Sequence, residues 1–494
     1  VAVANAADGN ILNITTQDAV NANKTIEATN VKGPGHTAIG QQNQIYSISA
    51  AEAEESQGSS SAIGNQNVVK GEQANAIGDG NDAYGHFTQS VGDNNKVYAD
   101  HSLGYGAHNK VGSQRAIGTP EKDVVVDKNT NKASVFGLNN EVVGKNVFVA
   151  GNDNKITDTS TSNATVIGFG ATASSANATA IGTAATALAN ETVAIGQAAK
   201  ASGQNSNAYG SQANASGTSS LAVGTGSVAS GDSAVAIGND STVTGGSAVA
   251  IGASATSTGK WSTALGDSAN AKGEKSVALS KDSYAKDDNS VALGSGTITR
   301  SATQENTATV NGITYNGFAG NTPVAVVSVG SDKTETYTPP DHSTPGRTVT
   351  ITPHTRQIIN VGAGEISATS TDAINGSQLY MIADQVGKNK TRIDNIRARS
   401  TDVKVKAGDN INVQEAYDDA NQVRTYTVST TKDIKADSYT VNNSSVQINQ
   451  NGINAGNKNI TNVADPKAPT DAANKRYVDN KVNKVDRKTR AGIA

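Results

Sequence analysis

Apolar residues recur along much of the chain with a fixed period of 14 residues. Each period ends in a glycine that follows an aliphatic residue, and alanine stands two places before the glycine in most copies. From residue 168 the closing positions, 14 apart, are Gly168, Gly182, Gly196, Gly210, Gly224, Gly238, Gly252, Gly266, Ser280 and Gly294. A second glycine falls half a period later in many copies. A fixed period of this kind indicates a repeat architecture.

The pattern within one period predicts two short strands joined by tight turns. Val235 and Ile237 alternate with Ala236, and alternation is typical of a half-buried strand. Glycine suits the turns because it adopts positive φ without strain. Each period should therefore form one coil of a parallel β-solenoid, and the stacked isoleucines should build one continuous core.

A less regular version of the repeat precedes residue 168. Its closing glycines are expected to be Gly40, Gly64, Gly78, Gly92, Gly104, Gly118, Gly137 and Gly151. Three of the intervals are longer than 14 residues, and extra residues must leave a solenoid as loops. These loops are expected near residues 41–60, 119–133 and 152–163.

The pattern changes after residue 294. Residues 307–361 indicate irregular β structure around a proline-rich loop. From Leu379 the apolar spacing becomes three and four, typical of a coiled coil, with Asn389 at one core position. The segment 359–375 returns in similar form at 461–474, each time before a short helical pattern, and two alternating strands resembling a hairpin lie between them.

These patterns divide the chain into six parts. The predicted parts are an N-terminal segment (1–36), a β-roll head (37–295, irregular over 37–165 and regular over 166–295), a β insertion and neck (296–376), a coiled coil (377–400), a β stalk module (401–463), and a second neck, coiled coil and start of an anchor (464–494).

Composition limits the kind of core and the kind of partner. Aromatic residues make up only 4% of the chain, which contains 50 glycines, so a thin core of small side chains is expected. One thin coil buries little surface, which favours association of several chains. The net charge of −4 and pI near 5.9 argue against a nucleic-acid partner. The chain has no cysteine and no run of 18 apolar residues.

The sequence contains no recognisable catalytic or metal-binding set. The six histidines fall at different phases of the repeat, so they cannot form a metal ladder on a solenoid. No nucleophile and base stand out as a pair, which predicts a non-enzymatic protein without a cofactor. The aspartate or threonine ladders of calcium-binding or ice-binding solenoids are also absent from the sequence.

Several motifs together resemble the trimeric autotransporter adhesins. They are the "SxAIG" repeats, "ATSTDAINGSQL", "NGINAGNKNITNV" and the final "RKTRAGIA", which occur in the family's order over nearly the whole chain. The resemblance implies a mainly β protein: a homotrimeric head of left-handed parallel β-rolls with the isoleucine row inside each roll or toward the threefold axis, then β-rich neck and stalk modules and short parallel trimeric coiled coils.

The resemblance also implies where the protein acts and what it binds. The family's members are bacterial adhesins on the surface of Gram-negative cells, held in the outer membrane by a C-terminal anchor whose start "RKTRAGIA" resembles. Their partners include cell-adhesion receptors of the carcinoembryonic-antigen-related type and matrix proteins such as collagen. A trimeric phage-type tail fibre or depolymerase is the alternative, but it would need a carboxylate cluster that the sequence lacks.

Two sets of candidate site residues follow. The long loops are expected to bind the host partner, with Trp261 as an exposed aromatic contact; the candidates are Tyr46, Glu54, Glu121, Lys122, Asp123, Lys128 and Trp261. Asn389 either fixes the register of the coiled coil as a polar core residue or joins its two symmetry mates in holding an anion, a chloride, on the axis.

Overall fold

The structure, a computed structural model, describes residues 2–4, 13–15, 37–46, 59–113, 126–339, 346–401, 403–421, 423–440 and 445–493. Contacts divide the chain into two units, Val1–Ile374 and Asn375–Ala494. The first unit is a β-solenoid with its C-terminal extension, and the second contains both helices. The mainly β fold with a solenoid head is as predicted.

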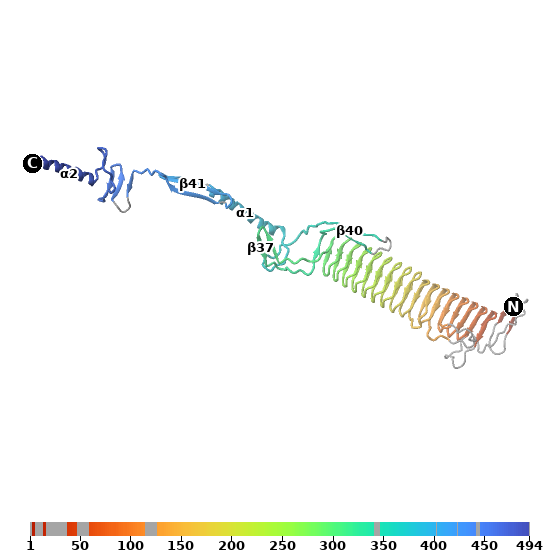
Figure 1. Cartoon of the computed structure of the whole chain (residues 1–494). Helices are drawn as coiled ribbons and strands as arrows, with labels where there is room; N and C mark the ends of the chain where they lie inside the picture. Colours follow the sequence, from red (N-terminus) through yellow and green to blue (C-terminus); the bar gives the residue numbers. More distant parts are fainter. Residues whose placement is uncertain are drawn as a thin grey trace. The chain divides into compact units, whose positions relative to one another are not determined.

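Most coils contribute one strand to each of two parallel sheets, and Figure 1 shows the coils stacked in chain order. The sheet of 20 strands, the long-strand sheet, contains β1 (Ala2–Ala4), β2 (Asn13–Thr15), β3 (Thr37–Gln41), β5 (Ser61–Asn65), β7 (Asn75–Asp79), β9 (Gln89–Asp93), β11 (Leu103–Ala107), β13 (Ser134–Leu138), β15 (Phe148–Asn152), β17 (Thr165–Phe169), β19 (Thr179–Ile181), β21 (Val193–Ile195), β23 (Asn207–Tyr209), β25 (Leu221–Val223), β27 (Val235–Ile237), β29 (Val249–Ile251), β31 (Thr263–Leu265), β33 (Val277–Leu279), β35 (Val291–Leu293) and β38 (Val327–Ser328). The sheet of 16 strands, the short-strand sheet, contains β4 (Gln44–Tyr46), β6 (Val68–Lys70), β8 (Asp82–Tyr84), β10 (Lys96–Val97), β12 (Lys110–Val111), β14 (Glu141–Val142), β16 (Lys155–Ile156), β18 (Thr172–Ala173), β20 (Thr186–Ala187), β22 (Lys200–Ala201), β24 (Asn214–Ala215), β26 (Val228–Ala229), β28 (Thr242–Val243), β30 (Thr256–Ser257), β32 (Asn270–Ala271) and β34 (Tyr284–Ala285).

Alanine, rather than the isoleucine before each closing glycine, fills most of the interior of the regular coils. Ala180 and Ala236, two places before their closing glycines, are fully buried, whereas Ile195 is 36% exposed. At the same inward position Gly104 lacks room for even a methyl group, since a Cβ there would lie 2.6 Å from Val97 Cγ2. The expectation that isoleucines build the core inside each coil is therefore wrong. In the regular coils the two sheets lie so close that mainly alanine fits between them, and the isoleucines before the closing glycines point outward. Larger buried side chains, such as Val97 and Ile156, occur mainly in the irregular coils.

The pairing of strands aligns the closing glycines and corrects two of them. Gly92 pairs with Gly106, and Gly106 pairs directly with Gly137. Gly104 is therefore not a closing glycine, and Gly118 lies outside the described residues, within the single long coil between Gly106 and Gly137. The error arose because a glycine also occupies the inward position two residues before the closing glycine.

The half-period glycines are required by close stacking rather than by backbone conformation. A Cβ on Gly217 would lie 2.0 Å from the carbonyl oxygen of Gly231, although neither residue has φ in the left-handed region. Left-handed backbone occurs instead at polar positions of each coil, such as Asn205 (φ 58°) and Gln212 (φ 57°). The expectation that the half-period glycines supply positive φ is thus wrong.

A ladder of asparagines runs inside the first coils, three residues after each closing glycine. Asn81 shows the pattern: its Nδ2 donates to Asn67 Oδ1 at 3.1 Å and to the Gly92 oxygen at 2.7 Å. The members are Asn43, Asn67, Asn81, Asn95, Asn109, Asn140 and Asn154. From Ala171 onward small residues take this position. The asparagine ladder therefore connects the coils of the first half of the solenoid only.

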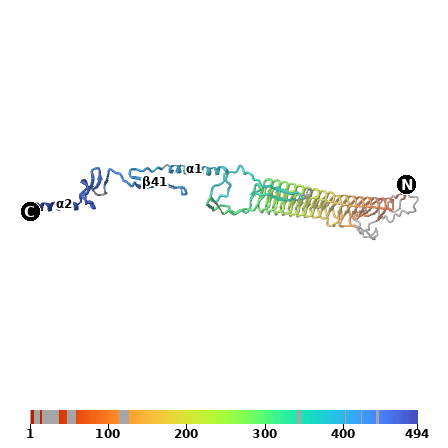
Figure 2. The same cartoon turned by 45° about the horizontal axis from the view of Figure 1, so that its top comes forward.

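The chain folds back over the last coils after the solenoid ends. Two hairpins follow, β36 (Thr307–Val310) with β37 (Ile313–Asn316), and β39 (Glu335–Tyr337) with β40 (Val349–Ile351). Figures 1 and 2 show β40 running along the last coils. Tyr337 packs on Tyr284 with ring centres 5.0 Å apart, and Lys286 pairs with Glu335 at 2.8 Å.

Arg356 covers the C-terminal end of the solenoid. Its guanidinium donates to the carbonyl oxygens of Ser295 and Val329 at 2.5 and 2.6 Å, and to Thr297 Oγ1 at 3.0 Å. Backbone acceptors at the end of a sheet otherwise have no further coil to pair with. This arginine therefore acts as a cap.

The second unit contains two helices and two small antiparallel sheets. The elements are α1 (Gly376–Thr401), the hairpin β41 (Ile411–Asp418) with β42 (Val423–Thr430), the sheet β43 (Ser438–Thr440), β44 (Val446–Asn449) and β45 (Gly452–Ala455), and α2 (Lys475–Ala491). The hairpin was predicted from its alternation. Among the described residues, neither helix is sufficiently long and apolar for a membrane span.

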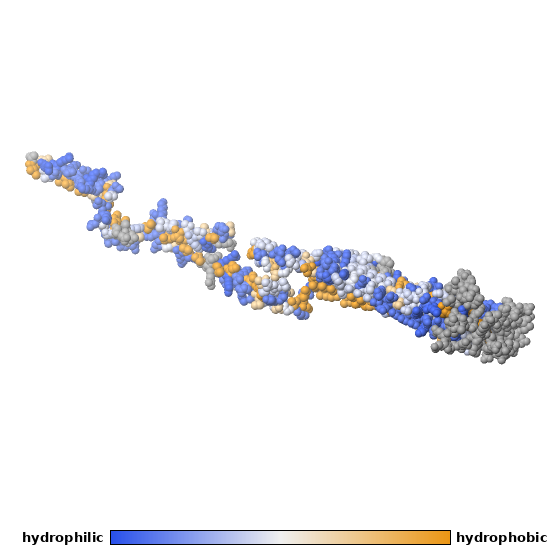
Figure 3. All heavy atoms as spheres, turned by 90° about the horizontal axis from the view of Figure 1, so that it is seen from below, coloured by the Kyte–Doolittle hydropathy of each residue, from blue (hydrophilic) through white to orange (hydrophobic). Residues whose placement is uncertain are grey.

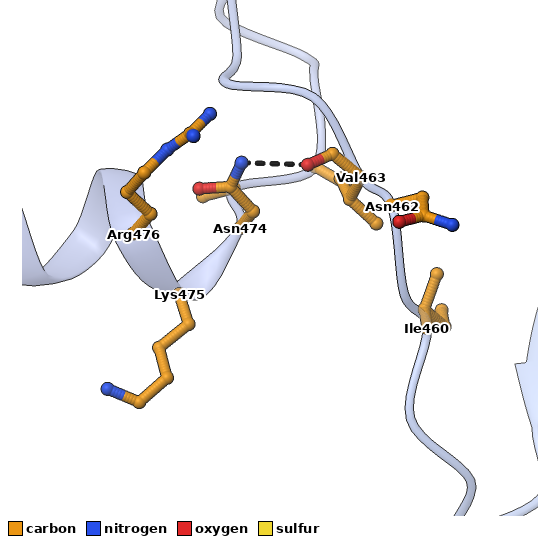
Figure 4. A pocket seen from close by; sticks show the side chains of 8 residues that line it. Ile460, Asn462, Val463, Asn474, Lys475 and Arg476 are labelled. Carbon is orange, nitrogen blue, oxygen red and sulfur yellow. Dashed lines mark hydrogen bonds between the residues drawn. The ribbon is translucent and has the colours of Figure 1, made fainter.

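The repeated junction motif ends in an asparagine that begins a helix. Asn375 Oδ1 accepts from the backbone N–H of Ser377 at the start of α1, and Asn474 Oδ1 accepts from that of Tyr477 at the start of α2. Figure 4 shows Asn474 also donating to the Val463 oxygen, at 2.8 Å. The same side chain thus caps the helix and holds the preceding linker.

Candidate functional site

The outer face of the long-strand sheet carries a continuous row of apolar side chains. The row consists of the residues immediately before the closing glycines, and its most exposed aliphatic members include Ile167, Ile195, Ile251, Leu265 and Leu293. Figure 3 shows hydrophobic residues gathered in a band along one side of the head. An exposed apolar band of this length is typical of a protein–protein interface. We call it the apolar row.

Aromatic residues extend the apolar row into the irregular coils. Phe136 lies between Tyr105 and Phe148, with ring centres 6.3 and 5.9 Å away. Tyr105 and Phe148 are exposed, and Phe136 is half-buried on the outer face of the sheet. Tyr98 differs, because it is buried and donates to Asp82 at 2.6 Å.

Asp127 holds the base of the longest loop. Its carboxylate accepts from the backbone N–H of Ser113 at 2.8 Å, from that of Asn129 at 2.9 Å and from Thr130 Oγ1 at 2.8 Å. Burial raises the pKa of this carboxyl, but these hydrogen bonds outweigh burial and hold the pKa below its ordinary value. The two ends of the loop are thereby fastened to each other.

The structure places only some of the predicted loop residues. Lys128 is exposed beside Asp127, and Tyr46 ends β4, where its backbone pairs with that of Lys70. Four candidates lie outside the described residues: Glu54, Glu121, Lys122 and Asp123. Whether these side chains form one surface stays a prediction.

Trp261 is exposed on the turn between β30 and β31, as its phase in the repeat predicted. Its side chain is 47% exposed, and φ is 58°. Lys260 Nζ lies 4.0 Å from the centre of the indole ring, and Lys275 Nζ lies 5.3 Å from it. Neither lysine was predicted from the sequence as a neighbour of the indole, although Lys275 stands one period after Trp261.

The apolar positions of α1 and its polar core position are all exposed within the single chain. Leu379, Ile382 and Val386 are each more than half exposed. Asn389 is exposed as well, and its Oδ1 accepts from Gln385 Nε2 at 3.0 Å. The helix therefore buries its apolar side only if other chains cover it.

Shifted pKa values in the head arise from contacts that support the fold. Burial raises the pKa of Glu335, but ion pairs with Lys286 and Lys333 outweigh it and leave the pKa lowered. Burial raises the pKa of Asp282 above its ordinary value. Within the part of the chain that the structure describes, no three His, Cys, Asp or Glu side chains are grouped so as to hold a metal ion.

Two parts of the chain match known protein families. The coiled stalk of trimeric autotransporter adhesin matches residues 357–402. The YadA head domain repeat matches residues 162–185, 187–213, 201–227, 215–241, 229–255, 244–266, 257–279 and 281–297. The matched head repeats are the regular coils, where the period of 14 is unbroken.

Two curated relatives are autotransporter adhesins. Autotransporter adhesin BtaE of Brucella suis biovar 1 (strain 1330) is 31% identical over 173 residues, which covers 32% of this chain and 20% of BtaE. Trimeric autotransporter adhesin AtaA of Acinetobacter sp. (strain Tol 5) is 33% identical over 151 residues, covering 26% of this chain and 4% of AtaA. The matches thus span a fifth or less of these relatives.

Solved structures of similar sequence cover smaller parts of the chain. A C-terminal YadA-like domain from Burkholderia pseudomallei is 35% identical and covers 31% of this chain and 60% of its own, with a TM-score of 0.21. The C-terminal stalk of AtaA from Acinetobacter sp. Tol 5 is 30% identical and covers 22% of this chain and 40% of its own, with a TM-score of 0.10.

Proposed function

Because the chain carries the head repeats and the coiled stalk of the trimeric autotransporter adhesins, we propose that it is a non-enzymatic, homotrimeric adhesin. It acts at the surface of a Gram-negative bacterium, anchored in the outer membrane. The solenoid serves as the binding head, and the segments after it hold the head away from the cell.

The apolar row is the observation that carries this proposal. Its side chains, Ile251 among them, are exposed along the outer face of the long-strand sheet in the single chain. Three chains around one axis would remove the row from water, and each fully buried aliphatic side chain contributes about 1.5–3 kcal/mol. The exposed apolar side of α1 supports the same stoichiometry, since coiled coils bury such rows between chains.

The long loops of the irregular coils are the proposed site for the host protein. Outside the apolar row, the regular coils present mainly small side chains outward, whereas recognition usually concentrates in loops on a rigid scaffold. Asp127 supplies the rigid base for the loop that contains Glu121, Lys122 and Asp123. The partner is a host surface receptor, of the carcinoembryonic-antigen-related type, or a matrix protein such as collagen.

Binding by shortened variants tests this proposal. The full chain is screened against purified receptors and collagen, and a positive partner is then measured with two variants. One variant shortens 119–133 to the regular interval, and the other starts at residue 166. Both should remain trimeric and lose most of the affinity. Full affinity in the chain that starts at residue 166 would show that the loops do not form the site.

Within the stalk, we propose that Asn389 and its two symmetry mates hold a chloride ion on the axis. Asn389 Oδ1 already accepts a hydrogen bond from Gln385 Nε2. The N–H groups of the Asn389 amide therefore serve as donors to another acceptor. Unpaired donors in a closed core cost about 1–3 kcal/mol each, and an anion on the axis satisfies all three amides.

A further inference from the structure

Trp261 places a bulky side chain at a turn position where the neighbouring coils carry small or flexible polar residues. Its φ of 58° lies in the left-handed region, where a bulky side chain is unfavourable. The same position of the preceding coils holds Ser219, Ser233 and Ser247, which adopt the same φ with small polar side chains. The indole is half-exposed and fills no core, so the fold gains little from tryptophan at this turn.

The charges around the indole favour an acidic ligand. Lys260 Nζ lies 4.0 Å from the ring centre, and no carboxylate among the described residues lies within ion-pair distance of this ammonium. Lys275 Nζ lies 5.3 Å from the ring centre and pairs with Glu274 at 3.1 Å. One ammonium beside the ring is therefore available to a negative group, and the second is only partly neutralised on the exposed surface.

The surface next to Trp261 suits a chain rather than a compact molecule. The preceding coil has Gly246 and Ser247 at the positions of Lys260 and Trp261, so the indole projects further from the surface than the side chains before it. Exposed serines continue along the same edge of the solenoid, about 4.8 Å apart from coil to coil. This arrangement offers hydroxyl groups at regular intervals beside one aromatic ring and one free ammonium.

From this geometry we propose that Trp261 and Lys260 form a binding site for an acidic saccharide. The C–H face of a sugar packs on the indole, its carboxylate pairs with Lys260, and neighbouring sugars donate to and accept from the serine row. A nucleic acid fits less well, because it is bound through several phosphates at once, whereas this site offers one ammonium without an ion pair among the described residues. The site is distinct from the proposed loops and adds a second class of ligand to the proposed adhesin.

The tryptophan itself reports binding, since it is the only one in the chain. The intact trimer is titrated with uronate-containing and sialylated oligosaccharides, and with neutral oligosaccharides of the same length as the control ligand. We expect an acidic oligosaccharide to change the tryptophan fluorescence, and the change to weaken with added salt, because ion pairs at an exposed site are screened. No response to any acidic oligosaccharide, or an equal response to the neutral ones, overturns the proposal.

Two variants separate a binding role from a structural one. Trp261→Ser copies the preceding coils and should retain the trimer and its melting temperature, while affinity, measured by calorimetry, falls about tenfold or more. Lys260→Ser should weaken binding and remove its salt dependence. Thr225→Ala, exposed on the turn between β25 and β26 and outside the serine row, should have little effect. If Trp261→Ser dissociates the trimer, the indole is a subunit contact and the proposal is wrong. Binding of the protein partner is measured in parallel, so failure of the loop proposal is seen separately.

Discussion

At the scale of single residues, Asp127 shows how one buried carboxylate stabilises a loop that interrupts the repeat. It joins Ser113, before the loop, to Asn129 and Thr130, after it. Its lowered pKa means that the ionised form is favoured in the folded state. The contribution to stability is therefore present above the ordinary pKa of 3.8 and is lost as the pH falls through the lower, folded-state pKa.

Replacing Asp127 tests this role. Asp127→Ala should destabilise the head by about 1–3 kcal/mol at neutral pH, because several buried donors lose their acceptor. The difference from the unmodified chain should shrink in acid, below pH 3.8. Thermal unfolding as a function of pH measures both effects. Asp158→Ala, at an exposed turn where Ser160 is the donor, serves as the control and should have a smaller effect. Equal effects of the two variants would contradict this role of Asp127.

At the scale of the coil, Gly245 and Gly246 test whether glycine is needed for close stacking of the coils or for its conformational freedom. A Cβ on Gly245 would lie 2.3 Å from the Gly259 oxygen, whereas the nearest atom to a Cβ on Gly246 is 3.9 Å away. Gly245→Ala should therefore cost about 1–3 kcal/mol through overpacking. Gly246→Ala should change stability by less than about 0.5 kcal/mol. Denaturant unfolding of the two variants measures the contrast, and similar losses in both would refute the stacking explanation.

At the scale of the helix, Asn389 interrupts an otherwise apolar seam. Asn389→Ile should raise the melting temperature of the stalk, since an apolar residue packs better at a coiled-coil core position. Scanning calorimetry of the full chain measures this, with Lys390→Ala, on the exposed side of α1, as the control. An electron-density map of the trimeric stalk should show chloride at Asn389. A map without an anion on the axis would leave Asn389 only the role of fixing the register of the three helices.

At the scale of the whole molecule, the apolar row decides the state of association. Burying a carboxylate within the apolar row costs desolvation free energy, so Ile251→Asp should weaken the trimer. Thr258→Asp, exposed on the side of the short-strand sheet, should leave the assembly unchanged. Light scattering over a range of concentrations measures the mass of each variant. A trimer that tolerates Ile251→Asp, or an unmodified chain that is monomeric, would place the interface elsewhere.

The sequence by itself determined the elements and their order. Its period of 14 residues predicted a coil of two strands, because neither strand nor turn pattern is interrupted between residues 168 and 294. It also predicted both helices and the hairpin between them. The asparagine ladder could have been found in the same way, since asparagine recurs three places after the closing glycines of the first coils. Local periodicity carries this information because strands and turns depend on neighbouring residues.

Only the tertiary structure decided which side of each strand faces inward. Alternation shows that Ala236 lies opposite to Ile237, but the spacing between the two sheets determines that alanine fits inside. In the same way, only stacking revealed that Gly106, not Gly104, aligns with Gly92. Lys275, beside Trp261, comes from the next coil. Such facts depend on distances between residues 14 or more apart, which the register of the coils sets and which no local pattern contains.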